Sequence, residues 1–294
     1  MESQIEIVEF TDPYCTWCWG SEPVLRHAQE AYGDQLRVRF VMGGLVEDRT
    51  TFYDPANGIG GAQWERQIAA HWLEASGRHG MPVDMAHYER VLGMPSTYPA
   101  NIAYEAAKLQ DQDLADRYLR RLREAAAIEG LAIHEPGVLA GLAAEIGLDR
   151  ERFTRDFAGP AVDAFAADRA MCAEYGVYGF PAFLVRVGER AQVISGYRGF
   201  SQVGGLIDLL AGSPVARQHP TFQDEVVLGF VDKYGSAATR EVAEVFEVSD
   251  EAADEALERL TAAGLLECVS AETGRLYRAI RGEGFCDTAT GACG

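Results

Sequence analysis

Residues 9–20, which read EFTDPYCTWCWG, decide the fold of this chain. The apolar alternation of residues 5–10 predicts a β-strand, and residues 22–32 have the pattern of a helix. A Pro/Asp turn separates the two. Cys15 and Cys18 therefore stand where a strand ends and a helix begins, one helical turn apart, so their sulfurs can face the same way and close a disulfide.

Cys15 lies at or beside the N-terminus of the predicted helix. Unpaired N–H groups and the helix macrodipole stabilise an anion there, and a thiolate is an anion. A Cys-x-x-Cys pair between a strand and a helix is also the thioredoxin-like redox arrangement. We interpret the pair as a dithiol–disulfide centre in which Cys15 attacks and Cys18 resolves the mixed disulfide. Two other interpretations remain open: half of a zinc site, which needs a second pair of ligands, or two buried structural cysteines.

Two stretches resemble a known family. Residues 12–20 look like the D-P-x-C-x-W-C-W-G signature of FrnE-like disulfide isomerases, in the DsbA-like branch of the thioredoxin superfamily; ClpXP adaptors of the SpxH type have a related motif. Residues 177–183, VYGFPAF, resemble the family's G-V-x-G-x-P-x-F stretch. The resemblance covers about residues 4–212. It implies an α/β thioredoxin-like fold with a helical insertion, and a cis proline, Pro181, that lies against the Cys pair.

The resemblance also implies how a substrate would bind. Pro181 would expose the Phe180 backbone so that it pairs with an extended substrate strand. Tyr14 and Trp17 could offer an apolar stacking surface to an unfolded peptide; for Trp19 an ordinary place in the core is an equal alternative.

The dipeptide between the two cysteines, Thr16-Trp17, departs from the best-studied family members, whose dipeptides contain His or Gly-Pro. It brings no positive charge to stabilise a thiolate. We therefore expect a redox potential well below that of DsbA, which is about −120 mV, and nearer those of reductases and isomerases.

Length and charge restrict the possible functions. The chain of 294 residues is long for one domain, so we expect two, and its net charge of −19 disfavours nucleic acid and anionic membranes as partners. Residues 1–4 lack the basic start of a signal peptide, and no run approaches the roughly 20 apolar residues of a membrane helix. We expect a cytoplasmic protein, in which a Cys pair is more often catalytic or metal-binding than structural.

The periodicity of the chain predicts its organisation. We expect residues 1–212 to form the thioredoxin-like domain, with a helical insertion at about 62–174 that covers the Cys pair. Residues 213–220 would be a linker. The predicted core elements are strands at 35–42, 182–187 and 191–195 and a closing helix at 200–210.

Residues 221–281 resemble a winged-helix domain, with helices at 224–234, 239–246 and 249–263 and a hairpin after them. A reader of DNA needs a basic recognition face. Residues 221–294 contain six basic and fifteen acidic residues, so we favour a module for protein interaction or dimerisation over DNA binding.

The remaining cysteines suggest further chemistry. Cys286 and Cys293 lie in the small, polar tail, 282–294, which we expect to be mobile. They could be an auxiliary redox pair that exchanges with Cys15 and Cys18, complete a four-thiol zinc site with them, or form a local disulfide. Cys172 and Cys268 should be buried and inert, and His27 should lie on the surface. No histidine spacing indicates a metal, and no organic cofactor is needed.

We therefore predict a thiol–disulfide oxidoreductase or isomerase that acts on protein disulfides. Its partners would be client proteins with disulfides or thiols and a thiol electron donor. One alternative is a binding protein of the SpxH type that delivers clients to a protease. Another is a glutathione-dependent isomerase with the DsbA-like fold, but those proteins typically have Ser where Cys15 stands.

Overall fold

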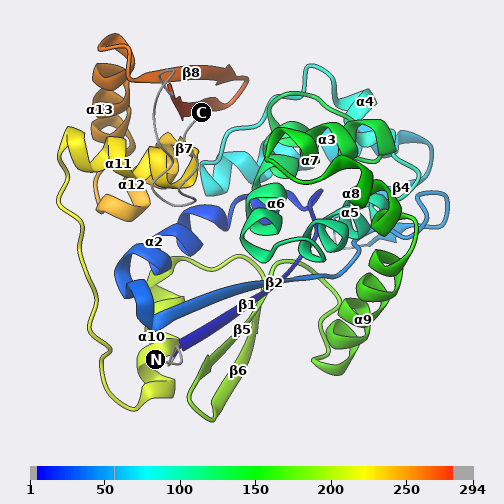
Figure 1. Cartoon of the computed structure of the whole chain (residues 1–294), viewed down its shortest axis with the longest axis horizontal. Coiled ribbons are helices and arrows are strands. Elements are labelled where there is room, and N and C mark those ends of the chain that lie inside the picture. Colours follow the sequence, from blue (N-terminus) through cyan, green and yellow to red (C-terminus); the bar gives the residue numbers. More distant parts are fainter. Residues whose placement is uncertain (1–4, 56, 281–294) are drawn as a thin grey trace.

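A four-stranded sheet lies at the centre of the molecule, with the strand order β2-β1-β5-β6 (Figure 1). The computed structural model describes residues 5–55 and 57–280. Strands β1 (Ile5–Thr11) and β2 (Leu36–Met42) are parallel, as expected for a βαβ unit, whereas β5 (Ala182–Val187) runs antiparallel to β1 and to its hairpin partner β6 (Arg190–Ser195). The thioredoxin-like fold that the sequence predicted is confirmed.

Successive side chains of a strand point to opposite faces of the sheet, and the two faces pack against different helices. Helices α2 (Glu22–Tyr32) and α10 (Phe200–Ala211) cover the face that carries Ile5, Ile7, Phe183 and Val185. The opposite face packs around Val8, Phe10, Ala182, Leu184 and Cys172. Because both faces are buried, the end of β1, where the Cys pair begins, is held from both sides.

The helical insertion is confirmed and lies to the right and top of the sheet in Figure 1. Its helices are α3 (Trp64–His79), α4 (Tyr88–Leu92), α5 (Tyr98–Lys108), α6 (Gln112–Ala127), α7 (Pro136–Glu145), α8 (Arg150–Phe157) and α9 (Pro160–Glu174). Asp111 and Asp149 cap α6 and α8 by accepting bonds from backbone N–H groups three residues on. Helix α4 and a small hairpin, β3 (Tyr53–Asp54) with β4 (Ile59–Gly60), were not predicted, because such short elements show no clear periodicity.

The C-terminal segment, which we define as residues 221–280, has the three predicted helices and hairpin. They are α11 (Asp224–Tyr234), α12 (Thr239–Phe246), α13 (Asp250–Ala262), β8 (Leu266–Ala271) and β9 (Gly274–Ala279). A short strand that was not predicted, β7 (Ser236–Ala238), completes a sheet of order β7-β9-β8. Val227, Phe230, Leu257 and Tyr277 are among the residues that form its core.

This segment packs directly against the thioredoxin-like part, and α12 lies on α2 (Figure 1). At the tip of the β8–β9 hairpin, the Thr273 N–H donates to the Val83 carbonyl at 3.1 Å. The expectation that His27 lies on the surface is wrong: its ring is buried, stacks on that of Phe200 with centroids 3.6 Å apart, and has Nδ1 3.7 Å from Glu244 on α12. A helix face that looks polar in sequence is covered here by residues far along the chain, Phe200 and Glu244.

The residues expected to be a linker also make contacts. The Arg217 Nε atom donates to the Tyr32 hydroxyl at 2.9 Å, and the Gln218 N–H donates to the Ala31 carbonyl at 2.7 Å. Among the helices of residues 5–55 and 57–280, none combines the length and apolar character that a membrane crossing requires.

Candidate active site at Cys15 and Cys18

The turn that carries Cys15 is built on a buried carboxylate, Asp12. Its side chain accepts hydrogen bonds from the N–H groups of Tyr14 and Leu45 at 2.8 and 2.7 Å, and from Thr97 and Asn101 at 2.7 and 2.8 Å. Burial raises the pKa of Asp12, and the four hydrogen bonds oppose that shift. Asp12 therefore joins the end of β1 to the loop that follows β2 and to the start of α5 in the insertion. These bonds fix the direction of the Cys-x-x-Cys turn.

Cys15 is the N-cap of helix α1 (Thr16–Trp19), so its sulfur faces the first turn. The Cys15 Sγ atom accepts a hydrogen bond from the Cys18 N–H at 3.2 Å and lies 3.5 Å from the Phe180 carbonyl oxygen. Both cysteines are free thiols, and they are unequal: Cys15 is 5% exposed and Cys18 is fully buried. An incoming disulfide can reach only the first of them.

The Cys18 thiol is poorly acidic. Burial raises its pKa well above the usual value, and the hydrogen bond with Cys15 and the charge of Glu9 add to that shift, whereas the Arg123 charge lowers it. Cys18 therefore keeps its proton until a neighbouring group removes it. This asymmetry agrees with the roles proposed for the two cysteines.

The peptide bond between Phe180 and Pro181 is cis, as the family resemblance implied. Pro181 is buried at the start of β5, and Phe180 is half-buried. The Phe180 ring lies directly over Gly43: a Cβ atom there would come within 1.9 Å of the ring. Gly43 is thus required for the approach of the ring to the sheet edge.

An open cavity of about 450 Å³ adjoins Cys15. The described residues that line it include no Lys or Arg, and aromatic side chains are frequent: Tyr14, Trp17, Phe52, Tyr53, Trp64, Trp72, Tyr178 and Phe180. The lining suits an apolar ligand better than an anionic one.

The two aromatic residues that the sequence assigned to substrate binding differ in exposure. Trp17 is half-buried, and its Nε1–H donates to His71 Nε2 at 3.2 Å. Burial lowers the pKa of His71, so its ring is neutral and can accept that bond. Tyr14 is only 2% exposed, and its hydroxyl lies 2.9 Å from His134 Nδ1. Trp19 belongs to the core. Trp17 is thus the more accessible surface for a peptide.

A buried ion pair, which the sequence analysis missed, lies beneath the Cys pair. Arg123 from α6 reaches Glu9 on β1, with Nη2 3.1 Å from Oε2, and also Thr11 at 2.5 Å. Burial raises the pKa of Glu9 to about 7, against the lowering effect of Arg123. Its other oxygen, Oε1, has no hydrogen-bond partner within the described part of the chain. The available signal was a lone acid on the same strand face as Ile5 and Ile7.

The remaining predictions concern the other four cysteines and a metal site. Cys286 and Cys293 lie outside the described residues. Cys172 is buried as expected, and burial raises its pKa to about 11, but Cys268 is only partly buried, so that expectation is wrong. Its strand lies at the edge of the three-stranded sheet, where no neighbour covers it fully. Across residues 5–55 and 57–280, no group of three or more His, Cys, Asp and Glu side chains could hold a metal ion.

Known proteins resemble this chain in sequence and in structure. The sequence profile of the thioredoxin family matches residues 9–198. The ClpXP adapter protein SpxH of Shouchella clausii is 31% identical over 281 residues, which cover 93% of this chain and 88% of that protein; the SpxH of Halalkalibacterium halodurans is 29% identical over 279 residues, with the same coverage. Among solved structures, the cytosolic disulfide reductase DsbM from Pseudomonas aeruginosa has a TM-score of 0.53 at 27% identity and covers 70% of this chain and 95% of its own.

Proposed function

Because the chain belongs to the thioredoxin family, in its DsbA-like branch and related to SpxH, we propose that it is a thiol–disulfide oxidoreductase that acts on protein disulfides through Cys15 and Cys18. One observation carries the proposal. The more accessible sulfur, that of Cys15, lies at a helix N-terminus and 3.5 Å from the carbonyl oxygen before Pro181. A disulfide held along the Phe180 backbone would meet that sulfur first.

The exchange proceeds in two displacements. The Cys15 thiolate attacks one sulfur of the substrate disulfide, which forms a mixed disulfide and releases the other sulfur as a thiolate. Cys18 then gives its proton to the Glu9 carboxylate and attacks the Cys15 sulfur. The second substrate thiolate leaves, and a Cys15–Cys18 disulfide remains. A thiol electron donor, oxidised to its own disulfide, returns the pair to the dithiol.

Glu9 is suited to accept the Cys18 proton. Its pKa of about 7 lies close to neutral pH, so it can both take and release a proton there. Arg123, which touches it, stabilises the carboxylate form. We propose that Pro181 presents the Phe180 backbone to the substrate and that Trp17 and Tyr14, which line the cavity beside Cys15, contact it.

Reduction of insulin disulfides tests the proposal. The wild-type protein, supplied with dithiothreitol, should accelerate the precipitation of insulin chains, and Cys15→Ser should not. If the fully reduced wild-type protein gives only the background rate, the oxidoreductase proposal is wrong. The same assay with a chain that ends at Gly282 tests whether Cys286 and Cys293 are an auxiliary redox pair, because a changed rate would require it.

A second function, that of an adaptor, is favoured by the extent of the matches. The SpxH proteins match 93% of this chain, which includes the C-terminal segment, whereas DsbM covers 70%. The segment is acidic on α13, with Asp250, Glu251 and Glu255 exposed, which suits a protein partner with a basic surface better than DNA. DsbM is a cytosolic reductase, and this similarity supports a cytoplasmic location for this chain.

Binding to purified ClpXP distinguishes the two functions. An adaptor should bind in both wild-type and Cys15→Ser forms with equal affinity, because docking does not need the thiolate. Loss of binding in Cys15→Ser would tie the contact to disulfide exchange, and absence of binding in both forms would exclude this adaptor role.

A further inference from the structure

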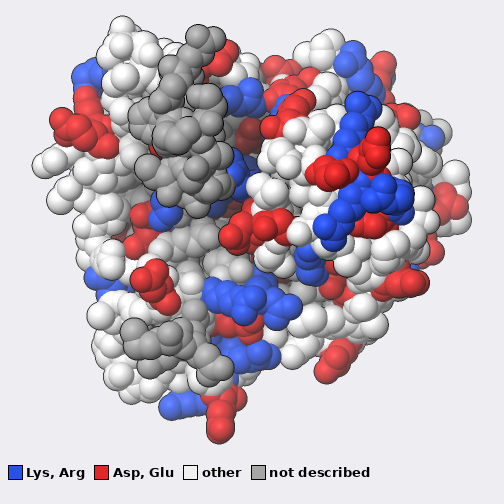
Figure 2. Space-filling model, in the orientation of Figure 1, with Lys and Arg blue, Asp and Glu red and all other residues white. Residues whose placement is uncertain are grey.

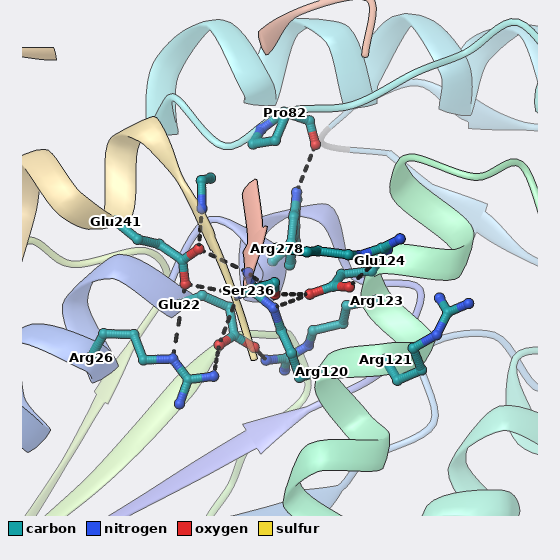
Figure 3. A network of polar contacts seen from close by, with 12 residues as sticks. Glu22, Arg26, Pro82, Arg120, Arg121, Arg123, Glu124, Ser236, Glu241 and Arg278 are labelled. Atoms are coloured by element: carbon teal, nitrogen blue, oxygen red, sulfur yellow. Dashed lines mark hydrogen bonds and ion pairs between the residues drawn. The ribbon is translucent and has the colours of Figure 1, made fainter. Parts of the chain in front are cut away.

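A series of buried charges extends from the C-terminal segment toward the dithiol centre, and Figure 3 shows the part of it from Glu241 to Arg123. Its first member is Glu241 on α12, which is 1% exposed. The carboxylate of Glu241 accepts two hydrogen bonds from the Arg120 guanidinium, both at 2.8 Å, and a third from the Ala238 N–H at 2.7 Å. This paired geometry holds the guanidinium plane in one orientation.

Arg120, on α6, carries that orientation to the Cys pair. Its guanidinium lies over the indole ring of Trp19, 4.6 Å from the ring centroid, and Trp19 is the residue that follows Cys18. The same guanidinium also lies 3.4 Å from Glu22 Oε2 and 2.7 Å from Glu124 Oε1. A change at Glu241 would therefore alter the contacts of Arg120 with Trp19, the neighbour of Cys18, and with Glu22.

Glu22 connects Arg120 to the second arginine of the series. Its two oxygens contact Arg120 and Arg123, as Figure 3 shows, and Arg123 in turn pairs with Glu9. Charges thus alternate from the C-terminal segment to the acid beside Cys18. Within the described part of the chain, the titratable groups that face Glu9 are Arg123 from α6, Glu22 from α2 and Cys18 from α1.

The C-terminal segment also braces Glu124, the other partner of Arg120. Ser236 donates a short hydrogen bond to Glu124, and Arg278 Nη2 lies 3.2 Å from it. A cleft of about 260 Å³ opens onto this network and is lined by residues of α2, α6 and the segment. In the hollow at the centre of Figure 2, basic and acidic atoms lie beside one another.

We propose that Glu241 is a positioning residue for the dithiol centre: from the C-terminal segment it holds Arg120, and through Arg120 it sets the places of Trp19, Glu22 and Arg123 around Cys18 and Glu9. The C-terminal segment is then a working part of the redox centre and not only an attached module. This proposal rests on the proposed function, because it assigns Glu241 to the chemistry of Cys15 and Cys18.

The alternation of charges gives the direction of the effect. Without the charge of Glu241, Arg120 would pair more closely with Glu22, and Arg123 would be left more fully to Glu9. A stronger positive charge at Glu9, together with the loss of one negative charge nearby, should lower the pKa of Glu9. Removal of Arg26, which lies 3.5 Å from Glu22 and 3.9 Å from Glu241, should raise that pKa, because Glu22 would then draw Arg123 away from Glu9.

The test is a titration of Glu9 in the full-length reduced protein. Carboxyl-labelled glutamate gives one NMR signal for each Glu, and the Glu9 signal is assigned by its loss in Glu9→Gln. We expect the Glu9 pKa to fall by about half a unit or more in Glu241→Gln, which is about a threefold change in acidity, and to rise in Arg26→Gln. The control is Glu258→Gln, an exposed acid on α13 that pairs with Arg275 outside the network, and it should leave the titration unchanged.

A second readout is the equilibrium constant of the Cys15–Cys18 pair with glutathione, which should change by about threefold or more in the same two variants and not in the control. If Glu241→Gln unfolds cooperatively and yet leaves the Glu9 titration unchanged, the proposal is wrong. If that variant does not fold, Arg26→Gln decides, because it alters a partly exposed member of the network. The titration of Glu9 is measurable even if the wild-type protein reduces no insulin, so failure of the proposed function is seen separately.

Discussion

The Arg123 guanidinium lies 3.1 Å from the Glu9 carboxylate, although 114 residues separate the two in the chain. Glu9 belongs to the central sheet and Arg123 to the helical insertion. The insertion therefore does more than cover the Cys pair, since it brings a positive charge beneath it. The dipeptide Thr16-Trp17 carries no charge, as the sequence analysis noted, and the counter-charge of the site comes from elsewhere in the fold.

Substitution of the two active-site cysteines should have different effects. Cys15→Ser removes the attacking sulfur, so we expect insulin reduction to fall by about 10³-fold or more. Cys18→Ser keeps the attack but cannot resolve it, so a mixed disulfide should accumulate and be visible by mass spectrometry. Cys268→Ser, which alters a thiol far from the Cys pair in sequence, is the control and should keep full activity. A Cys18→Ser protein that turns over normally would contradict the assigned roles.

Glu9 should make stability depend on pH. Its pKa is about 7 in the folded protein and near 4.3 in an unfolded chain, so folding favours the neutral acid. That contribution is present below about pH 4 and is lost as the pH rises through about 7. Glu9→Gln stays neutral, so its free energy of unfolding relative to wild type should increase by about 3 kcal/mol between about pH 4 and about pH 8. Urea unfolding at several pH values measures this, and a constant difference would contradict it.

Loss of Arg123 should be strongly destabilising. Arg123→Met leaves Glu9 buried without its counter-ion and removes one of the partners of Glu22, and breaking a buried pair in this way costs about 3–5 kcal/mol. The matched control is Arg78→Ala, which breaks an exposed pair with Glu74 and should cost no more than about 1 kcal/mol. Equal losses of unfolding free energy in the two variants would show that the buried pair contributes nothing special.

Gly43→Ala should impair the site without unfolding the protein. The new methyl group would overlap the Phe180 ring, so the ring must move, and we expect the segment before Pro181 to be displaced with it. A displacement of about 1 Å next to the reacting atoms can cost up to about a hundredfold in rate, and we expect a loss of about tenfold or more in insulin reduction. Gly141→Ala on α7, where the added carbon has no neighbour within 4 Å apart from its chain neighbours and the backbone of its own helix, is the control. Unchanged activity in Gly43→Ala would show that the Phe180 ring does not position the substrate.

Glu22 makes a second contribution to the pH dependence of stability, and it acts at acid pH. Burial alone would raise its pKa, but Arg123, Arg120 and Arg26 outweigh burial and lower it to about 2. A lowered pKa adds stability above the unfolded value of about 4.3, and that stability is lost as the pH falls through about 2. Glu22→Gln should therefore lose its deficit in stability relative to wild type as the pH approaches 2. A difference that does not change with pH would contradict this assignment.

Several features of the fold could be predicted because they depend on neighbours in the chain. The strand of residues 5–10, the turn with Cys15 and Cys18, and the following helix each have a local pattern, and the stretch around Pro181 carries a family motif. The same holds for the helical insertion predicted at about 62–174, where the structure has long helices such as α3, α6 and α9. Strand β7 and helix α4 are too short for a period to be visible, and they were missed.

The environment of the Cys pair was decided by contacts between distant residues. Nothing near Glu9 in the sequence says that Arg123 will meet it, and nothing near His27 says that Phe200 will cover it. The fully buried charges of this site are stable only in their ion pairs, because each alone would carry a large desolvation cost, and such pairs form only once β1, α2, α6 and α12 have packed together. Local sequence was therefore enough for the sheet, the helices and the two cysteines, whereas the proton affinities around Cys18 and the link to the C-terminal segment exist only in the assembled tertiary structure.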